Sequence, residues 1–511
     1  MNEHAIRRVV IVGGGTAGWM AAAALSTRLD RREVGVTLVE SDEIGTVGVG
    51  EATIPHLAVF NTMLGINEDE FLAACQGTFK LGIEFVDWGA EGERYFHPFG
   101  PHGHDLRGVH FHQLYLREAR RRPLPDIREW SMSAVAASLD RFARPGPDAR
   151  LPLSQVAYAF HFDASLYARF LRGRAEAEGV TRIEGKIVEV TLGGAQGHVQ
   201  TVTLADGREI EGDLFIDCSG FRGLLIEQKL GTGYDDWSKW LPCDRAVTVP
   251  SPLIGPPEPF VRCTARSAGW QWRIPLQHRM GNGLVYSSAH MSREEAERSL
   301  LANLEADPVG QTRHLAFTAG RRRKAWNANV VSLGLASGFI EPLESTSIHL
   351  IQVGITKLLA LFPDKRFDPA ERDEYNRQTQ EIAEDIRDFI ILHYSATRRQ
   401  DSDFWNYCRT MELPNKLASK LELWRSKGRI FREGAELFGT PSWVAVLLGQ
   451  GLVPEELEPT AEAVDSALIE EALEKMRMSY RRMAEHMPLH ADFIARACAA
   501  AAAAAAAVAA A

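Results

Sequence analysis

The chain has 511 residues, is 45% hydrophobic and 24% charged, and carries a formal net charge of −10. These values are typical of a globular protein with two or three domains, and the acidic balance gives no general attraction to nucleic acid or membranes. Six scattered cysteines without a C-x-x-C pair favour reduced thiols and speak against a metal site. The apolar run over residues 9–25 is interrupted by four glycines and lacks signal-peptide flanks, so we expect a soluble cytoplasmic protein.

The first expected element is a buried strand over residues 8–12, which runs directly into the sequence G-G-G-T-A-G. Glycines in this pattern let the backbone approach a pyrophosphate, and the N–H groups of the following helix bind it. A second strand over residues 36–40 ends in an acid about 20 residues further on, where a ribose hydroxyl is commonly held. The pattern predicts a dinucleotide site formed by Gly13, Gly15, Thr16, Ala17, Gly18 and Glu40.

The segment G-V-G-E-A-T-I-P over residues 48–55 is rich in glycine and small side chains. We interpret it as a strap over an isoalloxazine ring, with Val49, Gly50 and Ala52 as contacts; the alternative is a surface loop before a helix. Alternating apolar and polar residues over 81–87 predict a half-buried strand. Residues 92–125, rich in His, Tyr, Phe and Arg, favour an irregular segment that lines a cavity.

The middle and C-terminal parts predict a mixture of strands and helices. A helix with an Asp or Ser cap is expected over residues 163–172. Strands are expected around 182–191, 198–204 and 208–217, and the last should return beside the first glycine turn, as in FAD enzymes with two dinucleotide-binding domains. Residues 240–290 predict antiparallel strands of a second sheet, and 364–487 a layer of helices.

Two further segments carry unusual patterns. Trp270 and Trp272 are two residues apart and should share one face of a strand, either as ordinary packing or as a partition beside a flavin. Residues 334–347 combine a small-residue turn with a helix start whose free N–H groups can hold an anion. We expect Leu335 and Gly338 of this turn to contact a cofactor; the alternative is an ordinary capped helix start.

Five motifs occur in the order G-x-G-x-x-G, G-V-G-E-A-T-I-P, F-K-L-G-I, W-x-W-x-I-P and F-I-E-P-L-E-S-T. In this order they resemble the flavin-dependent tryptophan halogenase family, and they span residues 11–350. The lysine before L-G-I and the W-x-W-x-I-P motif separate that family from aromatic hydroxylases. The resemblance implies an α/β, Rossmann-like fold of the flavoprotein monooxygenase type, with a second β-sheet and a C-terminal helical layer.

The resemblance also implies a domain organisation. Residues 1–360 would form the FAD-binding and halogenation core, with substrate-side strands near residues 60–130 and 240–330. Residues 361–490 would form a helical region that covers the substrate. The alanine-rich tail over residues 497–511 is expected to have no function.

The implied activity is that of a two-component halogenase. Reduced FAD (FADH2), supplied by a separate flavin reductase, would react with dioxygen and a halide ion, chloride or bromide, to form hypohalous acid. This oxidant would reach Lys80, which hydrogen-bonds it or forms a haloamine, and an electron-rich arene would then attack the halogen. Glu344 would stabilise the cationic intermediate and accept the ring proton, since a nearby carboxylate can serve as both charge and base.

The remaining implied site residues hold the halide and the arene. Backbone N–H groups around Thr346 and Ser347 would bind the halide, and the H-x-F segment would enclose the substrate ring through His97, Pro98 and Phe99. Familiar tryptophan-specific members have Gly where this chain has Ser347, which affects the choice between chloride and bromide.

The larger departure is C-terminal. The Tyr-Tyr, Glu and Phe-Trp set that recognises the amino-acid part of free tryptophan has no counterpart between residues 400 and 460, although Trp443 is a candidate pocket residue. An indole-like small aromatic is therefore the expected substrate, and the protein is expected to be a monomer or homodimer. The alternatives are an aromatic monooxygenase that hydroxylates its substrate, or a non-catalytic flavin-binding protein.

Overall fold

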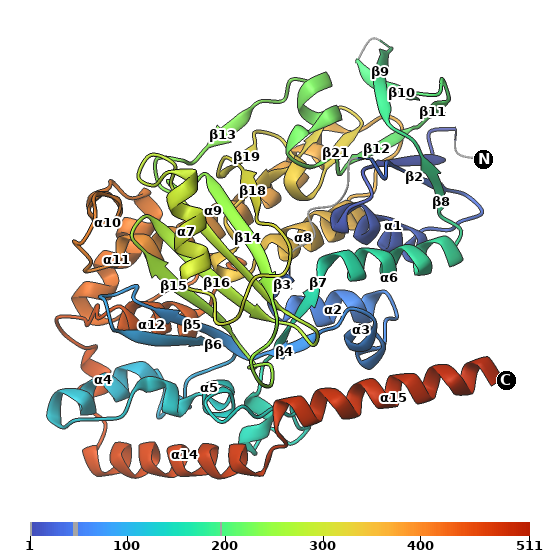
Figure 1. The fold of residues 1–511 in the computed structure, drawn as a ribbon. Coiled ribbons are helices and arrows are strands. Elements are labelled where there is room, and N and C mark those ends of the chain that lie inside the picture. Colours follow the sequence, from blue (N-terminus) through green and yellow to red (C-terminus); the bar gives the residue numbers. More distant parts are fainter. Residues whose placement is uncertain (1–2, 44–49, 195–196, 511) are drawn as a thin grey trace. The chain divides into compact units, whose positions relative to one another are not determined.

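The computed structural model describes residues 3–43, 50–194 and 197–510 (Figure 1). The chain divides into two compact units. The first contains residues 1–76, 162–242 and 316–384, and the second contains residues 77–161, 243–315 and 385–511. Among the described residues, no helix is both long and apolar enough to cross a membrane.

The first unit is built on a six-stranded sheet with the order β20-β21-β12-β1-β2-β8. β1 pairs in parallel with β2 on one side and β12 on the other, which is the arrangement of a dinucleotide-binding fold. Helices α1, α6 and α8 belong to this unit, and α1 packs against both of the others. The bounds are β1 Arg8–Val12, α1 Thr16–Arg28, β2 Gly35–Glu40, α6 Ala164–Ala177, β8 Thr181–Glu184, β12 Leu214–Asp217, β20 Trp326–Asn327, β21 Val330–Ser332 and α8 Ser347–Ala360.

The strand expected to return beside the glycine turn is β12, because Asp217 lies in register with Val12. The predicted helix over 163–172 is confirmed as α6, and the Asp163 carboxylate caps it by accepting hydrogen bonds from the N–H groups of Ser165 and Leu166. Local signals sufficed for both elements, since a buried strand and an N-cap each depend on a few neighbouring residues.

Two of the expected strands each prove to be two strands. The run 182–191 breaks between β8 and β9, and the run 208–217 breaks between β11 and β12. β9, β10 and β11 instead form a separate antiparallel sheet. At Gly212, a Cβ would lie 2.9 Å from a Val10 methyl and 2.8 Å from the Phe215 ring, so this break needs glycine. The bounds are β9 Ile187–Gly193, β10 His198–Leu204 and β11 Glu209–Glu211.

Shorter elements complete the first unit. They are β3 Gly50–Ala52, α2 His56–Met63, α3 Glu68–Ala74, the 3-10 helix η3 Gly220–Arg222, the π-helix η4 Leu224–Lys229, β13 Tyr234–Asp236, β19 Gly320–Arg322, the 3-10 helix η5 Gly334–Ala336, β22 Gly338–Phe339 and the 3-10 helix η6 Pro342–Glu344. β13, β19 and β22 form a small antiparallel sheet.

The second unit is built on a seven-stranded sheet with the order β18-β14-β17-β16-β15-β5-β6. The prediction of antiparallel strands over 240–290 is confirmed, as is that of a strand over 81–87. Trp270 and Trp272 lie on β16 with ring centroids 5.9 Å apart, and both are buried. The bounds are β5 Gly82–Val86, β6 Arg94–Pro98, β14 Arg245–Ser251, β15 Val261–Arg266, β16 Gly269–Pro275, β17 Met280–Tyr286 and β18 Arg313–Ala316.

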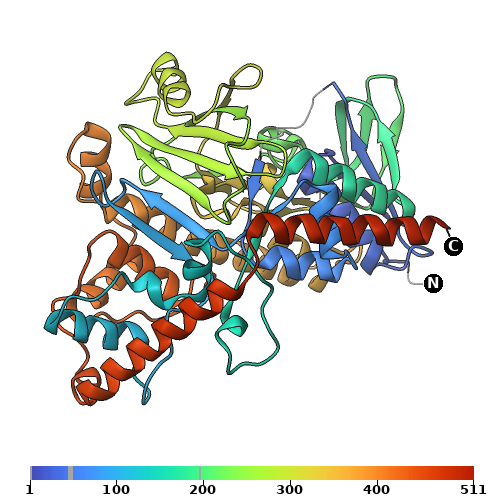
Figure 2. The same ribbon diagram turned by 60° about the horizontal axis from the view of Figure 1, so that its bottom comes forward.

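The prediction of an irregular segment over 92–125 is wrong for residues 94–98 and 111–121, whereas residues 99–110 contain no helix or ladder strand. The segment 92–125 forms β6 and the amphipathic helix α4, whose buried side includes Phe111, Leu114 and Glu118. The spacing of these three residues places them on one helix face, a pattern that the many His and Arg residues obscured. In the second unit α14 runs alongside α4 and α5 (Figure 2).

The predicted helical layer over 364–487 is confirmed. The remaining helices are α4 Phe111–Arg121, the 3-10 helix η1 Ile127–Trp130, α5 Met132–Ala137, the 3-10 helix η2 Pro152–Gln155, α7 Arg293–Ala302, α9 Pro369–Ser395, α10 Asp403–Thr410, α11 Asn415–Lys427, α12 Thr440–Gly449, α13 Pro459–Glu462, α14 Ser466–His486 and α15 His490–Ala510. α15 includes most of the alanine-rich tail. Two short strands, β4 Thr78–Lys80 and β7 Ala159–Asp163, pair in antiparallel fashion through residues 78–80 and 159–161.

Candidate active site

The glycine turn of the first unit has the geometry of a phosphate cradle. Gly13 has a φ of 109°, and a Cβ there would lie 2.3 Å from the carbonyl oxygen of Cys218. A Cβ on Gly18 would lie 1.9 Å from the carbonyl oxygen of Gly13. α1 begins at Thr16 after Gly15, and no side chain of the described residues caps it. The first-turn N–H groups of α1 therefore suit a pyrophosphate.

Glu40 ends β2 beside this turn. Its carboxylate accepts a hydrogen bond from Nε1 of Trp19 at 3.3 Å and another from Nε of Arg182. A Cβ on Gly14 would lie 1.5 Å from Oε2 of Glu40, so only glycine lets the carboxylate sit directly over the turn. A fixed acid in this place fits the ribose of a dinucleotide, so the residues present fit FAD.

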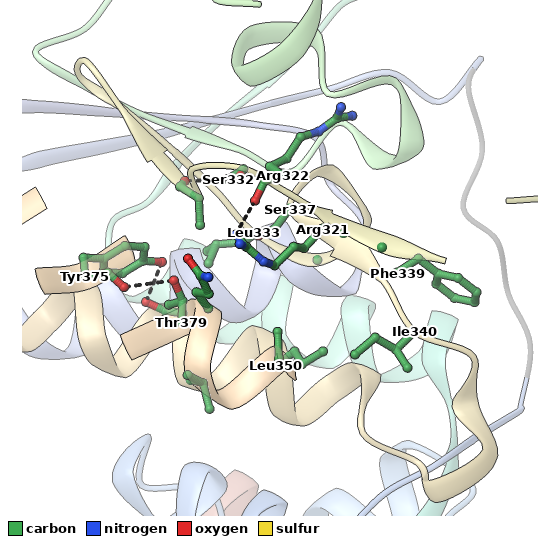
Figure 3. A pocket seen from close by; sticks show the side chains of 18 of the residues that line it. Arg321, Arg322, Ser332, Leu333, Ser337, Phe339, Ile340, Leu350, Tyr375 and Thr379 are labelled. Atoms are coloured by element: carbon green, nitrogen blue, oxygen red, sulfur yellow. Dashed lines mark hydrogen bonds between the residues drawn. The ribbon is translucent and has the colours of Figure 1, made fainter. Parts of the chain in front are cut away.

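The second segment that we expect to contact a cofactor, the turn at residues 334–338, lies near the start of α1. Gly334 has a φ of 61°, and its Cβ would lie 2.8 Å from the Cβ of Ala17, which brings the turn at Leu335 against the start of α1. This turn also borders a cavity whose other walls come from β19, α8 and α9 (Figure 3). Gly338 lines this cavity.

Of the expected strap, Val49 lies outside the described residues. Gly50 and Ala52 form β3, and both are buried. Burial raises the pKa of Glu51, which lies between them, to about 7. Residues 50–52 are therefore not part of a surface loop, which was the alternative for this segment.

The predicted acid and halide residues lie together at the start of α8. Glu344 ends η6 and is 1% exposed, and Ser345 turns the chain with a φ of 59° before α8 begins at Ser347. Thr346 is the N-cap residue, but its side chain caps nothing, and its buried Oγ1 has no hydrogen-bond partner in the part of the chain that the structure describes. An uncapped helix start with an unpartnered buried hydroxyl is a suitable anion site.

Lys80 lies in the second unit, on β4, and is fully buried. Its Nζ is 5.1 Å from the centre of the Phe99 ring. The N–H of Phe99 donates to the carbonyl of Leu81 at 2.9 Å. Because Leu81 follows Lys80 in the chain, this bond brings the two predicted residues, Lys80 and Phe99, together. A lysine ammonium over a ring face is favoured electrostatically.

An aromatic cluster occupies another part of the second unit. We use this term for His97, Phe389, Phe438 and Trp443. Phe389 and Phe438 are stacked with centroids 3.8 Å apart, and Phe389 meets Trp443 edge to face at 5.2 Å. Nε1 of Trp443 is buried and has no hydrogen-bond partner among the described residues. Pro98 follows His97 at the end of β6 and is also buried.

Charged residues next to this cluster are paired with one another. Nζ of Lys420 lies 5.3 Å from the Trp443 ring centre, and it donates to Oε2 of Glu436 at 3.0 Å and to the Phe431 carbonyl at 2.6 Å. Lys416 is 2.7 Å from Asp385 and 2.9 Å from Glu436. Phe389, Lys420 and Glu436 were not expected, because nothing in the local sequence relates them to residue 97.

The structure therefore joins the predicted residues in four groups. The glycine turn lies near the turn at Leu335, Glu344 precedes the halide candidates, and Lys80 lies over the Phe99 ring. His97 and Trp443 both pack against Phe389. Lys80 and Glu344 belong to different units. A parallel sheet with an uncapped glycine turn and a fixed acid at the end of the second strand defines a dinucleotide-binding fold of the flavoprotein type.

Comparisons with known proteins identify the family. A family model described as tryptophan halogenase matches residues 8–466. The solved structure of Xcc4156, a flavin-dependent halogenase from Xanthomonas campestris, is 48% identical, covers 97% of this chain and 99% of its own, and has a TM-score of 0.93. BrvH, a flavin-dependent halogenase from Brevundimonas sp. BAL3, is 47% identical over 96% and 99%, also with a TM-score of 0.93.

A curated relative agrees with these structures. Tryptophan 6-halogenase SttH from Streptomyces toxytricini is 36% identical over 97% of this chain and 99% of SttH. The chain belongs to the tryptophan halogenase family and is a flavin-dependent halogenase. The family resemblance and the expected fold class are confirmed.

Proposed function

We propose that this halogenase transfers an electrophilic halogen to neutral, indole-like arenes, using Lys80 and Glu344, and that a separate reductase supplies its reduced FAD. Bound FADH2 would supply the oxidation of halide by dioxygen to hypohalous acid. The cradle at Gly13 and Gly18 and the fixed carboxylate of Glu40 support the binding of FAD.

The burial of Lys80 and Glu344 supports their proposed roles. Hypohalous acid is unselective, so the oxidant must meet few groups other than the one that holds it. Lys80 offers N–H donors to the oxidant within a buried site. Glu344 is buried as well, and a carboxylate in such surroundings stabilises a cationic arene strongly before it removes the ring proton.

The start of α8 supports a halide site. The unpartnered Oγ1 of Thr346 and the first-turn N–H groups of α8 would donate to the ion. Ser347 adds a side chain at the first helical position. We propose that the enzyme uses both chloride and bromide and prefers bromide. Bromide is more weakly hydrated than chloride, so it loses less hydration free energy when it enters the buried site.

The paired charges beside the aromatic cluster carry the proposal about substrate. Free tryptophan brings an ammonium and a carboxylate, and each needs an opposite charge once it is taken out of water. Lys420, Lys416, Asp385 and Glu436 already neutralise one another. An arene without charged groups can use the ring faces of the cluster and leave these ion pairs intact.

The test compares kcat/KM for indole and for free tryptophan, with a flavin reductase present and bromide saturating. We expect kcat/KM to be at least tenfold higher for indole than for tryptophan, which corresponds to about 1.4 kcal/mol in transition-state binding. A higher kcat/KM for tryptophan would contradict the proposal. A product that gains oxygen instead of a halogen would favour the hydroxylase alternative.

A variant pair sharpens this test. Glu436→Gln removes the carboxylate that pairs with Lys420 and Lys416, and so offers a substrate carboxylate a cation; the preference for indole over tryptophan should decrease. Glu456→Gln is the matched control, since Glu456 pairs with Lys427 at an exposed site, and it should leave the preference unchanged. Equal preferences in both variants would mean that these charges do not govern selectivity.

A further inference from the structure

A second buried side chain lies across the strands from Lys80. In the β4–β7 pair, Thr78 is opposite His161 and Lys80 is opposite Ala159. His161 and Lys80 are therefore diagonal neighbours on one face, at a spacing that long side chains bridge. Thr78, Lys80 and His161 are all fully buried.

The hydrogen bonds of Thr78 determine which nitrogen of His161 carries the proton. The Thr78 hydroxyl donates its single hydrogen to the carbonyl of Pro275 at 2.7 Å, because a carbonyl can only accept. Its contact with Nδ1 of His161 at 2.8 Å must then be donated by the imidazole. Nδ1 carries the hydrogen, so Nε2 of His161 presents a lone pair.

That lone pair is unused. Nε2 of His161 is buried and has no hydrogen-bond partner within the described ranges of the chain. Burial and the positive charge of Lys80 hold the pKa of His161 well below its usual range, so the ring stays neutral and Nε2 stays an acceptor. A buried acceptor without a donor is costly and rare, which points to a ligand that brings the donor.

The nearby His490 shows the contrast. Its Nε2 accepts from the N–H of Phe79 at 3.0 Å, and its Nδ1 donates to the carbonyl of Pro257 at 2.8 Å. Both ring nitrogens of His490 are used, Nε2 in holding α15 to β4 and Nδ1 in holding it to Pro257, as expected for a structural histidine. His161 differs because only its Nδ1 has such a role.

We propose that Nε2 of His161 accepts a hydrogen bond from the hydroxyl of hypohalous acid while Lys80 donates to the same oxygen. This inference rests on the proposed function. Hypohalous acid carries the O–H that Nε2 of His161 lacks, its oxygen can accept from the Lys80 ammonium, and both contacts leave its halogen free. A halide or hypohalite ion has no hydrogen for Nε2, so the site selects the neutral acid.

The halogen transfer that follows is balanced. The arene carbon forms a bond to the halogen, the oxygen–halogen bond breaks, and its electron pair goes to the oxygen that Lys80 and His161 hold. That oxygen takes up a proton and leaves as water, and the arene loses its ring proton. The sum is HOX + ArH → ArX + H2O.

Two substitutions separate the roles of the two ring nitrogens. In His161→Asn, the amide NH2 takes the place of Nδ1 and keeps the contact with Thr78, but nothing replaces Nε2. In His161→Gln, the longer amide places an oxygen acceptor near the position of Nε2. The measurements are brominated indole formed per FADH2 oxidised, free oxidant trapped by monochlorodimedone, and the melting temperature.

We expect His161→Asn to lower brominated indole per FADH2 at least tenfold and to raise the trapped oxidant, because the acid is no longer held beside Lys80. His161→Gln should recover several-fold of the lost yield. An unchanged yield and an unchanged trapped fraction in His161→Asn would overturn the inference. So would equal losses in both variants that follow their melting temperatures, since that is the behaviour of a purely structural histidine.

The same experiment separates this inference from the proposed function. If the wild-type enzyme forms neither brominated indole nor trappable oxidant, the proposed function fails and the inference fails with it. If the wild type brominates indole and His161→Asn behaves identically, only the role of His161 is refuted.

Discussion

The close approach of α1 to the glycine turn makes Gly18→Ala a sharp test of the cofactor site. A Cβ at this position would lie 1.9 Å from the Gly13 carbonyl oxygen, and this neighbour is backbone. To restore a 3.0 Å contact, α1 has to move by about 1.1 Å from the turn. Forcing an extra carbon into such a site typically costs about 1–3 kcal/mol.

The net effect also includes a gain, since alanine is favoured over glycine in a helix by about 1 kcal/mol. We therefore expect Gly18→Ala to lose up to about 2 kcal/mol of stability. The FAD dissociation constant should rise at least tenfold, because the N–H groups of α1 leave the pyrophosphate. Urea unfolding without FAD and a fluorescence titration with FAD measure the two effects separately.

Gly173→Ala is the matched control. Gly173 also lies inside a helix, α6, but a Cβ there meets nothing within 4 Å. This variant should be stabilised by about 0.5–1 kcal/mol through helix propensity, and it should bind FAD like the wild type. If Gly18→Ala matched Gly173→Ala in both stability and FAD affinity, the assignment of this turn as the cofactor cradle would be refuted.

Three further predictions concern other residues. Lys80→Ala should abolish halogenation, measured by product mass, while FAD binding and hydrogen peroxide formation persist; retained product would show that free oxidant or another residue does the work. Glu344→Gln keeps the side-chain volume, so it should fold normally but lower kcat for indole bromination about 10²–10⁴-fold, and a smaller loss would argue against its role as base. Burial lowers the pKa of His112 to about 4, so the folded state binds fewer protons than the unfolded state between pH 4 and 6.5, and stability decreases as the pH falls through this range. His112→Gln keeps a donor toward the Gly428 carbonyl but cannot titrate in this range. Between pH 7 and 5, the free energy of unfolding in urea should therefore fall by about 1–2 kcal/mol less for His112→Gln than for the wild type. If both proteins lost the same stability, His112 would be excluded as the cause.

The sequence alone determined the features that depend on neighbouring residues. The glycine turn, the acid at the end of β2 and the Asp163 cap each lie within one short segment, so their spacing and residue types were sufficient to predict them. The order of five motifs also identified the family. The break between β11 and β12 was not predicted; Gly212, which lies at this break, packs against Val10, some 200 residues away.

Tertiary structure decided which distant residues meet. His161 lies 83 positions from Thr78, and only strand pairing brings its ring to that hydroxyl and leaves Nε2 without a donor. In the same way, packing brings His97 against Phe389 and Phe438, which lie about 290 and 340 residues further along the chain. No local pattern predicts such contacts, because they depend on how whole elements pack and on which buried polar atoms that packing leaves unpaired.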